Sequence, residues 1–356
     1  MSSNTYMKQG ITSLFDIEFN REKLSRLGNP LEKLSTVINF EMFRVELEDT
    51  MLNHNKKSNA GAKPIDVVLM FKVLIVKRLY NLSDEQTEYQ LIDRQSFKDF
   101  VGLSNGDKVP DARTIWSFQE NLIKNGVEER LFSQFHNFLD NLGFYVNDGK
   151  IVDASFAEVP RQRNTKEENA LIKESRGDEL WNDKPNKKRQ KDIDARWTKK
   201  NHEKHYGYKD HAKIDNKSKL IDTYEVTSAE VHDSQPTEAL IRDEDNEQDF
   251  YADSAYAGEP IDTMLKIKGL KPQIIEKANR NKPLTDEQKA NNKEKSKVRC
   301  RVEHVFGFVT QNMGDFCMRC IGFTRAKGII GLTNLLYNMC RYEQIVRLNL
   351  LEPKIN

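Results

Sequence analysis

The chain has 356 residues, and its 56 Lys or Arg nearly balance its 55 Asp or Glu, leaving a formal net charge of +1. This length is sufficient for two domains, or for one domain with a large insertion. The charge balance excludes an overall basic protein, so any nucleic-acid surface must come from uneven placement of charge. A disulfide framework is unnecessary at this size.

The four cysteines are interpreted as reduced thiols. Only Cys317 and Cys320 are closely spaced, and no second pair completes a four-ligand zinc site. A metal knuckle at this pair is the alternative. The first residues lack the basic-then-apolar order of a signal peptide, and the longest apolar stretch, residues 67–76, is interrupted by Lys72. We therefore expect no membrane segment and a cytoplasmic location.

Residues 1–142 are predicted to form a helical N-terminal domain, because apolar spacing typical of helices recurs from about residue 11. Ser83 begins a capping-box sequence for a helix that extends to about Ile92. Asp111 can cap another helix, which ends near Gly126. One helix is predicted from apolar residues at three- and four-residue steps: Val68, Phe71, Ile75 and Leu79.

Two functions fit these short helices. Helices joined by tight turns can form a helix-turn-helix that reads DNA. They can equally form a packing bundle that supports an enzyme or its dimer. The sequence leaves both open, and so the domain is expected to bind DNA ends, to multimerise, or both.

A mixed α/β pattern begins at residue 143 and is assigned to a catalytic domain over 143–345, with a tail at 346–356. Two β-rich runs flank Asn147-Asp148-Gly149, which predicts a hairpin that ends at Asp153. Further strands are expected at 206–214, 220–226, 250–252 and 272–275, with a helix at 237–242.

A basic, polar insertion is expected at about 161–204, as a surface insertion or mobile loop, because it is poor in apolar residues. From Lys184 to Lys219 there are thirteen Lys or Arg against five Asp or Glu, a balance of +8. Cations interleaved with aromatic residues suit phosphates and exposed bases, although a solvated charge run is the alternative. The predicted DNA contacts are Lys187, Lys188, Arg189, Arg196, Trp197, Lys199, Lys200, Lys204, Tyr206, Tyr208, Lys209 and His211.

Three carboxylates are the candidate metal ligands and catalytic groups. Asp153 and Asp253 each end a short apolar β run, so neighbouring strands would bring them together. Glu303 lies on a helix predicted from about residue 295 to 312, beside an apolar stripe that would dock on the sheet. Arg299, one turn earlier, can orient Glu303 or contact a phosphate. Hard cations such as Mg²⁺ prefer such carboxylate oxygens.

Four motifs carry a resemblance to a known family. They are Lys150-Ile-Val-Asp153-Ala-Ser, Tyr206-Gly-Tyr-Lys-Asp-His211, Tyr251-Ala-Asp253-Ser-Ala-Tyr-Ala-Gly258 and Arg299-Cys-Arg-Val-Glu303-His-Val-Phe-Gly307. Together they resemble the DDE transposases of bacterial insertion sequences, most closely the "insertion sequence five" group. The N-terminal segment from Pro110 to Phe118 is similar to that group's N-terminal transposase domain.

This resemblance implies a ribonuclease-H-like catalytic fold and a triad of Asp153, Asp253 and Glu303, with Arg299 as the family's arginine. It also implies two Mg²⁺ ions, replaceable by Mn²⁺, and strand cleavage and transfer at terminal inverted repeats of double-stranded DNA, with a target DNA as second partner. A homo-dimer or higher multimer on DNA, associated with the bacterial nucleoid, is expected. In a related signature a tyrosine and a lysine stand where this chain has Ser296 and Thr310.

The remaining residues of these motifs leave alternatives. His205 and His211 fit either a substrate contact or a structural role, whereas His304 faces away from Glu303 and is not expected to be a ligand. A metal-dependent nuclease of the same fold, which cuts but never joins, would use the same carboxylates. A non-catalytic DNA-binding regulator derived from a transposase is the rival from another class.

Overall fold

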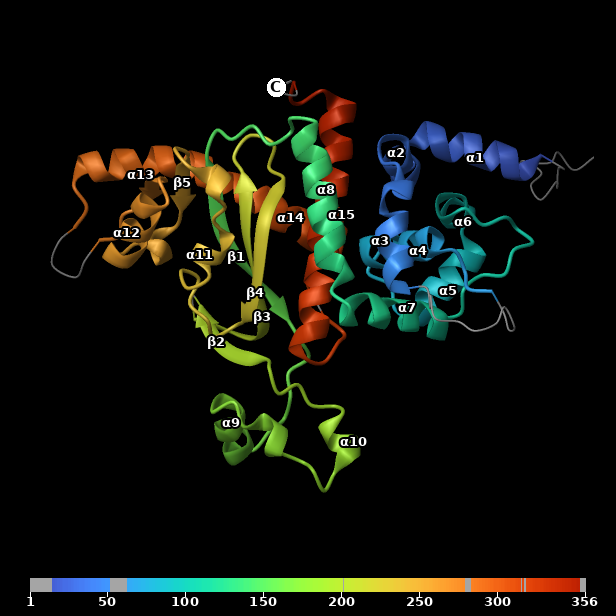
Figure 1. Ribbon diagram of the computed structural model, residues 1–356, viewed down its shortest axis with the longest axis horizontal. Coiled ribbons are helices and arrows are strands. Elements are labelled where there is room, and N and C mark those ends of the chain that lie inside the picture. Colours follow the sequence, from blue (N-terminus) through green and yellow to red (C-terminus); the bar gives the residue numbers. More distant parts are fainter. Residues whose placement is uncertain are drawn as a thin grey trace, which may run out of the picture.

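The computed structural model describes residues 15–51, 63–200, 202–278, 283–314, 316 and 318–352. Within this part, all secondary structure elements up to residue 141 are helices, as the apolar spacing predicts (Figure 1). Cys317, one of the two closely spaced cysteines, lies outside the described residues. The elements are α1 (Asp16–Leu27), α2 (Pro30–Val37), η1 (Phe40–Phe43), α3 (Arg44–Met51), α4 (Val67–Leu79), α5 (Asp84–Asp93), α6 (Gln95–Val101), α7 (Ala112–Lys124) and α8 (Val127–Asn141).

Local capping determines where these helices begin, and two of the caps were predicted. Ser83 and Gln86 form the reciprocal capping box of α5, and the Asp111 side chain accepts a hydrogen bond from the Thr114 amide at the start of α7. Asp66 caps α4 by accepting from the amides of Val68 and Leu69. These bonds satisfy amides that have no partner within their own helix.

The sheet is mixed and is centred on β1 (Lys150–Glu158). On one side β3 (Glu203–Asp215) runs antiparallel to β1, and its far edge pairs with both β2 (Arg196–Lys200) and β4 (Ile221–Ser228). On the other side β5 (Asp249–Ala252) and then β6 (Lys271–Ile274) run parallel to β1. The strands predicted at 206–214, 220–226, 250–252 and 272–275 are thus confirmed, while β2 was not predicted.

The expected hairpin before Asp153 is wrong, because residues 144–149 form no strand. Asn147 and Gly149 do adopt the left-handed backbone of a tight turn, with φ of 56° and 102°. However, Phe144 and Tyr145 pack their rings against Tyr342 and His136, in place of pairing with β1. The alternation of β-rich residues therefore reflected burial of two aromatic side chains.

Helices cover both faces of the sheet. On one face Ile151 and Ala212 join a hydrophobic core that extends into the N-terminal helices and the long α15 (Phe323–Leu348). On the other, Val152 and Phe250 join a smaller core. The elements of this smaller side are α11 (Thr237–Leu240), η3 (Asp243–Asp245), η4 (Ser254–Tyr256) and α12 (Glu259–Ile267). None of the helices within the described residues is long and apolar enough to cross a membrane.

The polar insertion is an ordered lobe that projects from the sheet (Figure 1). It contains α9 (Lys166–Lys173), η2 (Gly177–Glu179) and α10 (Pro185–Lys188). Its helices gather around Trp181, which is 7% exposed and donates its indole N–H to Glu168 at 2.6 Å. One buried aromatic side chain thus gives the insertion a packed centre that its composition did not suggest.

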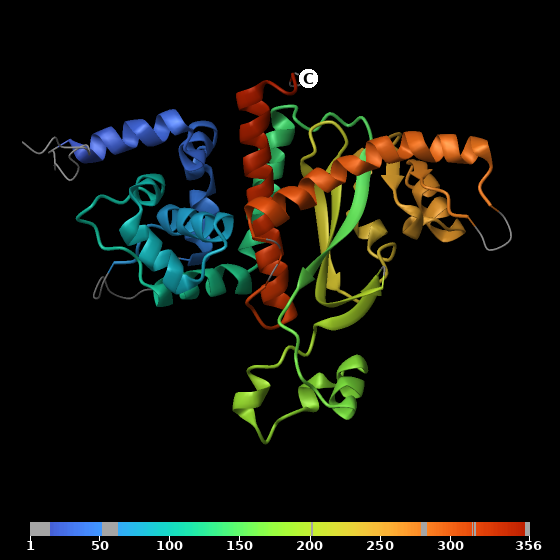
Figure 2. The same cartoon turned by 180° about the vertical axis from the view of Figure 1, so that it is seen from behind.

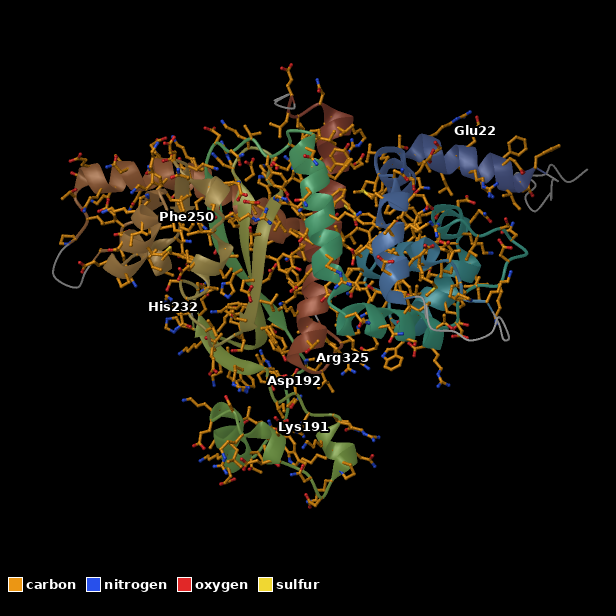
Figure 3. The ribbon with its side chains drawn as sticks, viewed as in Figure 1. Glu22, Lys191, Asp192, His232, Phe250 and Arg325 are labelled. Carbon is orange, nitrogen blue, oxygen red and sulfur yellow. The ribbon has the colours of Figure 1, made fainter. Side chains whose placement is uncertain are left out.

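Asp192 ties this lobe to the rest of the protein. Its carboxylate, 1% exposed, accepts hydrogen bonds from the Tyr208 hydroxyl of β3 at 2.8 Å and from the Gly322 amide before α15 at 3.0 Å. It also accepts from the amides of Asp194 and Ala195. In Figure 3 Asp192 and Lys191 lie where the lobe meets the sheet. A charged acceptor of this kind leaves several buried donors without partners when it is removed.

We expect Asp192→Ala to lower the free energy of unfolding by at least about 2 kcal/mol, because the buried donors of Tyr208 and Gly322 lose their acceptor. Chemical denaturation monitored by circular dichroism measures this change. Asp183→Ala, which removes an exposed carboxylate of the same lobe, is the matched control and should change stability by less than about 0.5 kcal/mol. Equal stability of the two variants would contradict the role given to Asp192.

Candidate active site

The pairing of β1 with β5 brings two of the predicted carboxylates to one place. Ile151 lies opposite Tyr251 in the parallel ladder, and Asp153 and Asp253 each follow two residues later. Because side chains alternate along a strand, this offset directs both carboxylates to the same face of the sheet. Asp253 ends β5 and caps η4 by accepting a hydrogen bond from the Ala255 amide at 2.8 Å.

Burial makes Asp153 unusual. Its side chain is only 15% exposed, and this burial raises the pKa of Asp153 to about 6. The hydrogen bond from the Ala154 amide and the charges of Arg299 and Lys200 lower the pKa, whereas the charge of Asp253 raises it. Burial and the neighbouring charge of Asp253 thus both disfavour the ionised form of Asp153. The site is therefore short of positive charge.

Arg299 links Asp153 to the third predicted carboxylate. Its guanidinium donates to Asp153 at 3.0 Å and to Glu303, one helical turn later, at 3.1 Å. The predicted role of Arg299 in orienting Glu303 agrees with this contact. Arg299 is 22% exposed and Glu303 is 64% exposed, so the chain of charges runs from the buried strand to the surface.

The single helix predicted over 295–312 is wrong in one respect. The segment consists of α13 (Asp286–Arg299), a 3-10 turn η5 (Cys300–Val302) and α14 (Glu303–Asn312), which together cross the sheet (Figure 2). Three valines of the predicted stripe, Val302, Val305 and Val309, are nevertheless buried in the main core. The tighter turn falls between Arg299 and Glu303, the two candidate site residues of this segment.

The structure brings the three acids together only in part. Asp153 and Asp253 interact through their charges, but Glu303 is reached through Arg299. Within the described ranges, no three side chains of His, Cys, Asp or Glu are arranged as a metal-binding group. The donor pair Asp153 and Asp253 still suits a hard divalent cation, because hard cations prefer carboxylate oxygens as ligands.

Tyr256 is a site residue that the sequence did not identify. Its side chain is fully buried, and its hydroxyl has no hydrogen-bond partner within the described residues. Burial raises the pKa of Tyr256 well above its ordinary value, and the charges of Asp153, Asp233 and Asp253 raise it further. It therefore presents a neutral hydroxyl among the carboxylates. Its position three residues after Asp253 was the available signal.

Two histidines have structural contacts. His211 is buried and bonds the Thr227 hydroxyl at 2.8 Å, and burial lowers its pKa to about 4, which keeps the ring neutral. His205 stacks on Phe156 with ring centres 4.0 Å apart and bonds Glu158 at 2.8 Å. His304 lines a cleft with Lys219 and Arg341, away from the carboxylates.

The predicted DNA contacts divide by exposure. Four on β3 are buried, which does not fit direct contact with DNA in this structure: Tyr206, Tyr208, Lys209 and His211. Lys209 instead pairs with Asp233 at 2.7 Å. Trp197 and Lys199 of β2 and Lys204 at the start of β3 are exposed. Along β2 the exposed Trp197 and Lys199 alternate with less exposed side chains, whereas β3 is buried from Tyr206 onward.

Four of the other predicted cations, in the lobe and on the less exposed side of β2, contact nearby residues of the protein. Lys187 pairs with Glu168 at 2.7 Å and lies over the Trp181 ring. Lys188 donates to the Asp178 carbonyl and to Asn182. On β2, Arg196 lies near Glu230 and Lys200 near Asp233, each at 3.3 Å. Arg189, after α10, is exposed.

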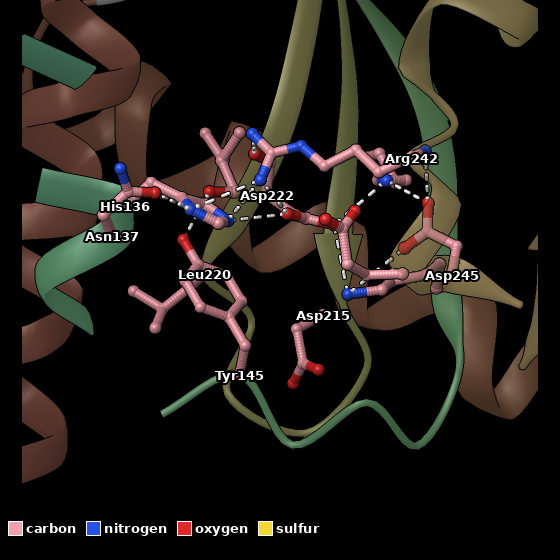
Figure 4. A network of polar contacts seen from close by, with 12 residues as sticks. His136, Asn137, Tyr145, Asp215, Leu220, Asp222, Arg242 and Asp245 are labelled. Carbon is pink, nitrogen blue, oxygen red and sulfur yellow. Dashed lines mark hydrogen bonds and ion pairs between the residues drawn. The ribbon is translucent and has the colours of Figure 1, made fainter. Parts of the chain in front are cut away.

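A buried ionic network fixes the first residue of β1 (Figure 4). Lys150 and Lys213 both lie 3.0 Å from the Asp222 carboxylate, and both also pair with Asp245. Burial alone would raise the pKa of Asp222, but Lys150, a hydrogen bond from His136, and Lys213 hold it well below its ordinary value. The four buried charges of Lys150, Lys213, Asp222 and Asp245 thus compensate one another. The first of them, Lys150, stands three residues before Asp153 on β1.

Two family models match the chain. One, described as "Transposase DDE domain", matches residues 146–339, and another, described as "Transposase domain (DUF772)", matches residues 19–121. The first covers more than half of the chain, which therefore belongs to the DDE-type transposases. Membership implies DNA binding and, normally, a divalent metal. No solved structure matches the chain.

We expect Asp153→Asn to stabilise the metal-free protein, and the gain to grow as pH rises from 4.5 to 7.5. The folded pKa of about 6 lies above the ordinary 3.8, so the folded protein holds this proton more tightly than the unfolded chain does. Ionisation at higher pH therefore costs stability, by up to roughly 3 kcal/mol. Thermal melts in a chelator measure the gain, with the exposed Asp140→Asn as control. A gain that shrinks with rising pH would contradict the assignment.

Proposed function

We propose that this transposase catalyses metal-dependent DNA strand cleavage and strand transfer at terminal inverted repeats, as a member of the "insertion sequence five" group. The single observation that carries the proposal is the pairing of Asp153 with Asp253 on one face of the mixed sheet. Asp153 is mostly buried and its pKa is raised even though Arg299 pairs with it, and placing a carboxylate in so poorly solvated a position is costly to a fold. Such a cost is characteristic of a site that performs chemistry.

Asp153 and Asp253 would hold divalent Mg²⁺, or Mn²⁺ in its place, with Glu303 as the third ligand. When bound, two such ions activate the attacking oxygen and stabilise the leaving oxygen of a phosphodiester. The Tyr256 hydroxyl, which has no hydrogen-bond partner within the described residues, supports the fit, because it is a buried donor near the charges of Asp153 and Asp253 and can bond a carboxylate there.

The residues of the chain itself have separate roles in this proposal. Arg299 now neutralises Asp153 and Glu303 together, and its bonds would be exchanged for a phosphate as the acids turn to the cation. Glu303 is exposed enough to make that movement without disturbing the core. The network of Lys150 and Asp222 would hold β1 in place meanwhile.

DNA is proposed to run along the exposed residues of β2 and of the start of β3, near the catalytic sheet. Trp197 is 43% exposed and lies beside Tyr206, while Lys199 and Lys204 present cations on the same stretch. Cations neutralise phosphates and an exposed indole stacks on bases. Of the cations in the lobe, Arg189 remains the best placed for a phosphate.

Three broader assignments belong to the same proposal. The meander β1–β3–β4 followed by parallel β5 and β6 supports a ribonuclease-H-like sheet. A helical N-terminal domain over 1–142 would bind DNA ends, mediate a homo-dimer or higher multimer, or both. The catalytic domain would span 143–345, although α15 continues to Leu348 and shares one core with the N-terminal helices.

A cut-only nuclease is the nearest alternative, since hydrolysis and joining use the same carboxylates. The decisive substrates are the element's own ends with a labelled 3′ terminus, together with a second, unlabelled DNA. Labelled strands joined to the second DNA support a transposase, and cleavage without joining supports the nuclease. A regulator would bind the ends and release no product in Mg²⁺.

We expect Asp153→Asn and Glu303→Gln to abolish Mg²⁺-dependent cleavage of these ends, by about a hundredfold or more, because each removes a charge while keeping its shape. DNA binding in Ca²⁺ should remain within about twofold of the wild type. Gel analysis of end-labelled DNA and anisotropy provide the two measurements.

Glu294→Gln is the matched control for Glu303→Gln, because Glu294 is exposed on α13, where it pairs with Lys297. It should cleave normally. Unchanged cleavage by Asp153→Asn would remove the paired aspartates from the mechanism and overturn the proposed function.

Charge reversal of Lys199 and Lys204 should weaken duplex binding and reduce its dependence on salt. Each lost phosphate contact lowers the slope of log K against log salt by about 0.9. Reversal of Lys187 and Lys188, which are held within the lobe, should change the slope less. A salt titration that gives the same slope for both pairs would show that Lys199 and Lys204 do not contact DNA phosphates.

A further inference from the structure

A cleft of about 440 Å³ lies away from the carboxylates, between the N-terminal helices and α15. Its walls are the end of α4, the start of α5, one side of α7, and the segment 318–321 with the first turns of α15. Arg189 of the lobe completes the lining. Three parts of the chain that are distant in sequence therefore meet at one hollow.

Four charges of the cleft form pairs that hold its walls together. Lys77 of α4 pairs with Asp84 of α5 at 2.5 Å and donates to Gln119 of α7 at 2.7 Å. Arg325 of α15 forms a two-pronged pair with Glu120 of α7, at 2.7 and 2.8 Å. Such planar pairs fix both partners, so the shape of the hollow is set before any ligand binds.

Positive charge is in excess. The lining contains five Lys or Arg and three Asp or Glu. Arg189 and Arg319 are exposed, and neither has a carboxylate partner in the part of the chain that the structure describes. Glu85, the remaining acid, accepts a hydrogen bond from Ser83. Two guanidinium groups are thus available to an anion at the rim.

Trp116 supplies an aromatic surface in the same lining. It lies on α7, one turn before Glu120, and is 51% exposed. Its indole ring therefore offers an aromatic surface to a ligand in the cleft. An exposed indole beside unpaired arginines is the combination that stacks on a base and binds its phosphates.

We propose that this cleft binds an unpaired segment of a DNA strand, with a base against Trp116 and its phosphates at Arg189 and Arg319. This inference rests on the proposed function for the presence of DNA, and adds a second site to it. A duplex hides its base faces in the stack, so only an unpaired strand can offer one to Trp116.

Hydrogen bonds connect the cleft to the catalytic strand. The Met318 amide, in the wall of the cleft, donates to the carbonyl of Glu158, the last residue of β1, at 3.0 Å. The following amides of Gly322 and Phe323 donate to Asp192 and Asp194 of the lobe. A DNA strand bound in the cleft would thus have a fixed position relative to β1, the β-strand that carries Asp153.

The test compares a fluorescent ten-nucleotide single strand with a duplex closed by hairpins at both ends, in Ca²⁺ to prevent cleavage. Anisotropy should show that Trp116→Ala binds the single strand about tenfold more weakly or worse, and the closed duplex within about twofold of the wild type. Trp116→Phe should recover most of the affinity, because a smaller ring still stacks. Arg319→Ala should lower the salt slope for the single strand by about 0.7.

Two surface variants serve as controls. Tyr89→Ala removes a 65% exposed aromatic of α5 outside the cleft, and Arg26→Ala removes an exposed cation of α1. Both should bind the single strand normally. Melting temperatures of all variants should match the wild type, since every altered side chain is exposed.

Several results would overturn the proposal. Unchanged single-strand affinity in Trp116→Ala, or equal losses on both DNAs, would show that the cleft does not select an unpaired strand. Competition by a free mononucleotide as strong as that by the strand would show a small-molecule pocket instead. Because binding is measured without cleavage, these failures leave catalysis by Asp153 untouched, whereas cleavage by Asp153→Asn would overturn the proposed function and not the cleft.

Discussion

The parallel pairing of β1 with β5 is the constraint on which the rest of the site depends. It places Asp153 and Asp253 at the same offset beyond a paired residue and therefore on one face of the sheet. Two acids in a poorly solvated place oppose folding, and the fold compensates with Arg299 on the crossing segment. Arg299, the last residue of α13, donates to Asp153 and Glu303 at once.

The strand that carries Asp153 is held in place on both sides of this residue. At the start of β1, Lys150 is fixed in a buried set of compensated charges with Asp222. At its end, the Glu158 carbonyl is bonded by the segment that leads into α15. A strand held at both ends cannot move away to relieve the repulsion between its acid and a neighbour. Pre-organised charge of this kind is how enzymes favour binding of a cation or of a developing charge.

Local signals in the sequence were sufficient for part of this structure. The capping box at Ser83 and the strands around Asp253 were predicted because each depends on a few adjacent residues. Asp153, Asp253 and Arg299 were placed in one site from motif and spacing. Tyr256 was not, because its place in the site depends on burial by segments that are distant in the sequence. Composition also failed for Tyr208, whose apparent stacking role is replaced by a buried bond to Asp192.

The two ends of the insertion leave the sheet on either side of one residue. Gly207 of β3 faces Glu158 of β1 across one edge and Arg196 of β2 across the other. Strands lie about 4.8 Å apart, so the lobe's entry and exit are separated by roughly 10 Å, whatever lies between them. A chain closed over so short a gap can lengthen or shorten at little entropic cost. The lobe is thus an exchangeable cassette, in which related sequences can vary what they contact while β1 and its aspartate stay unchanged.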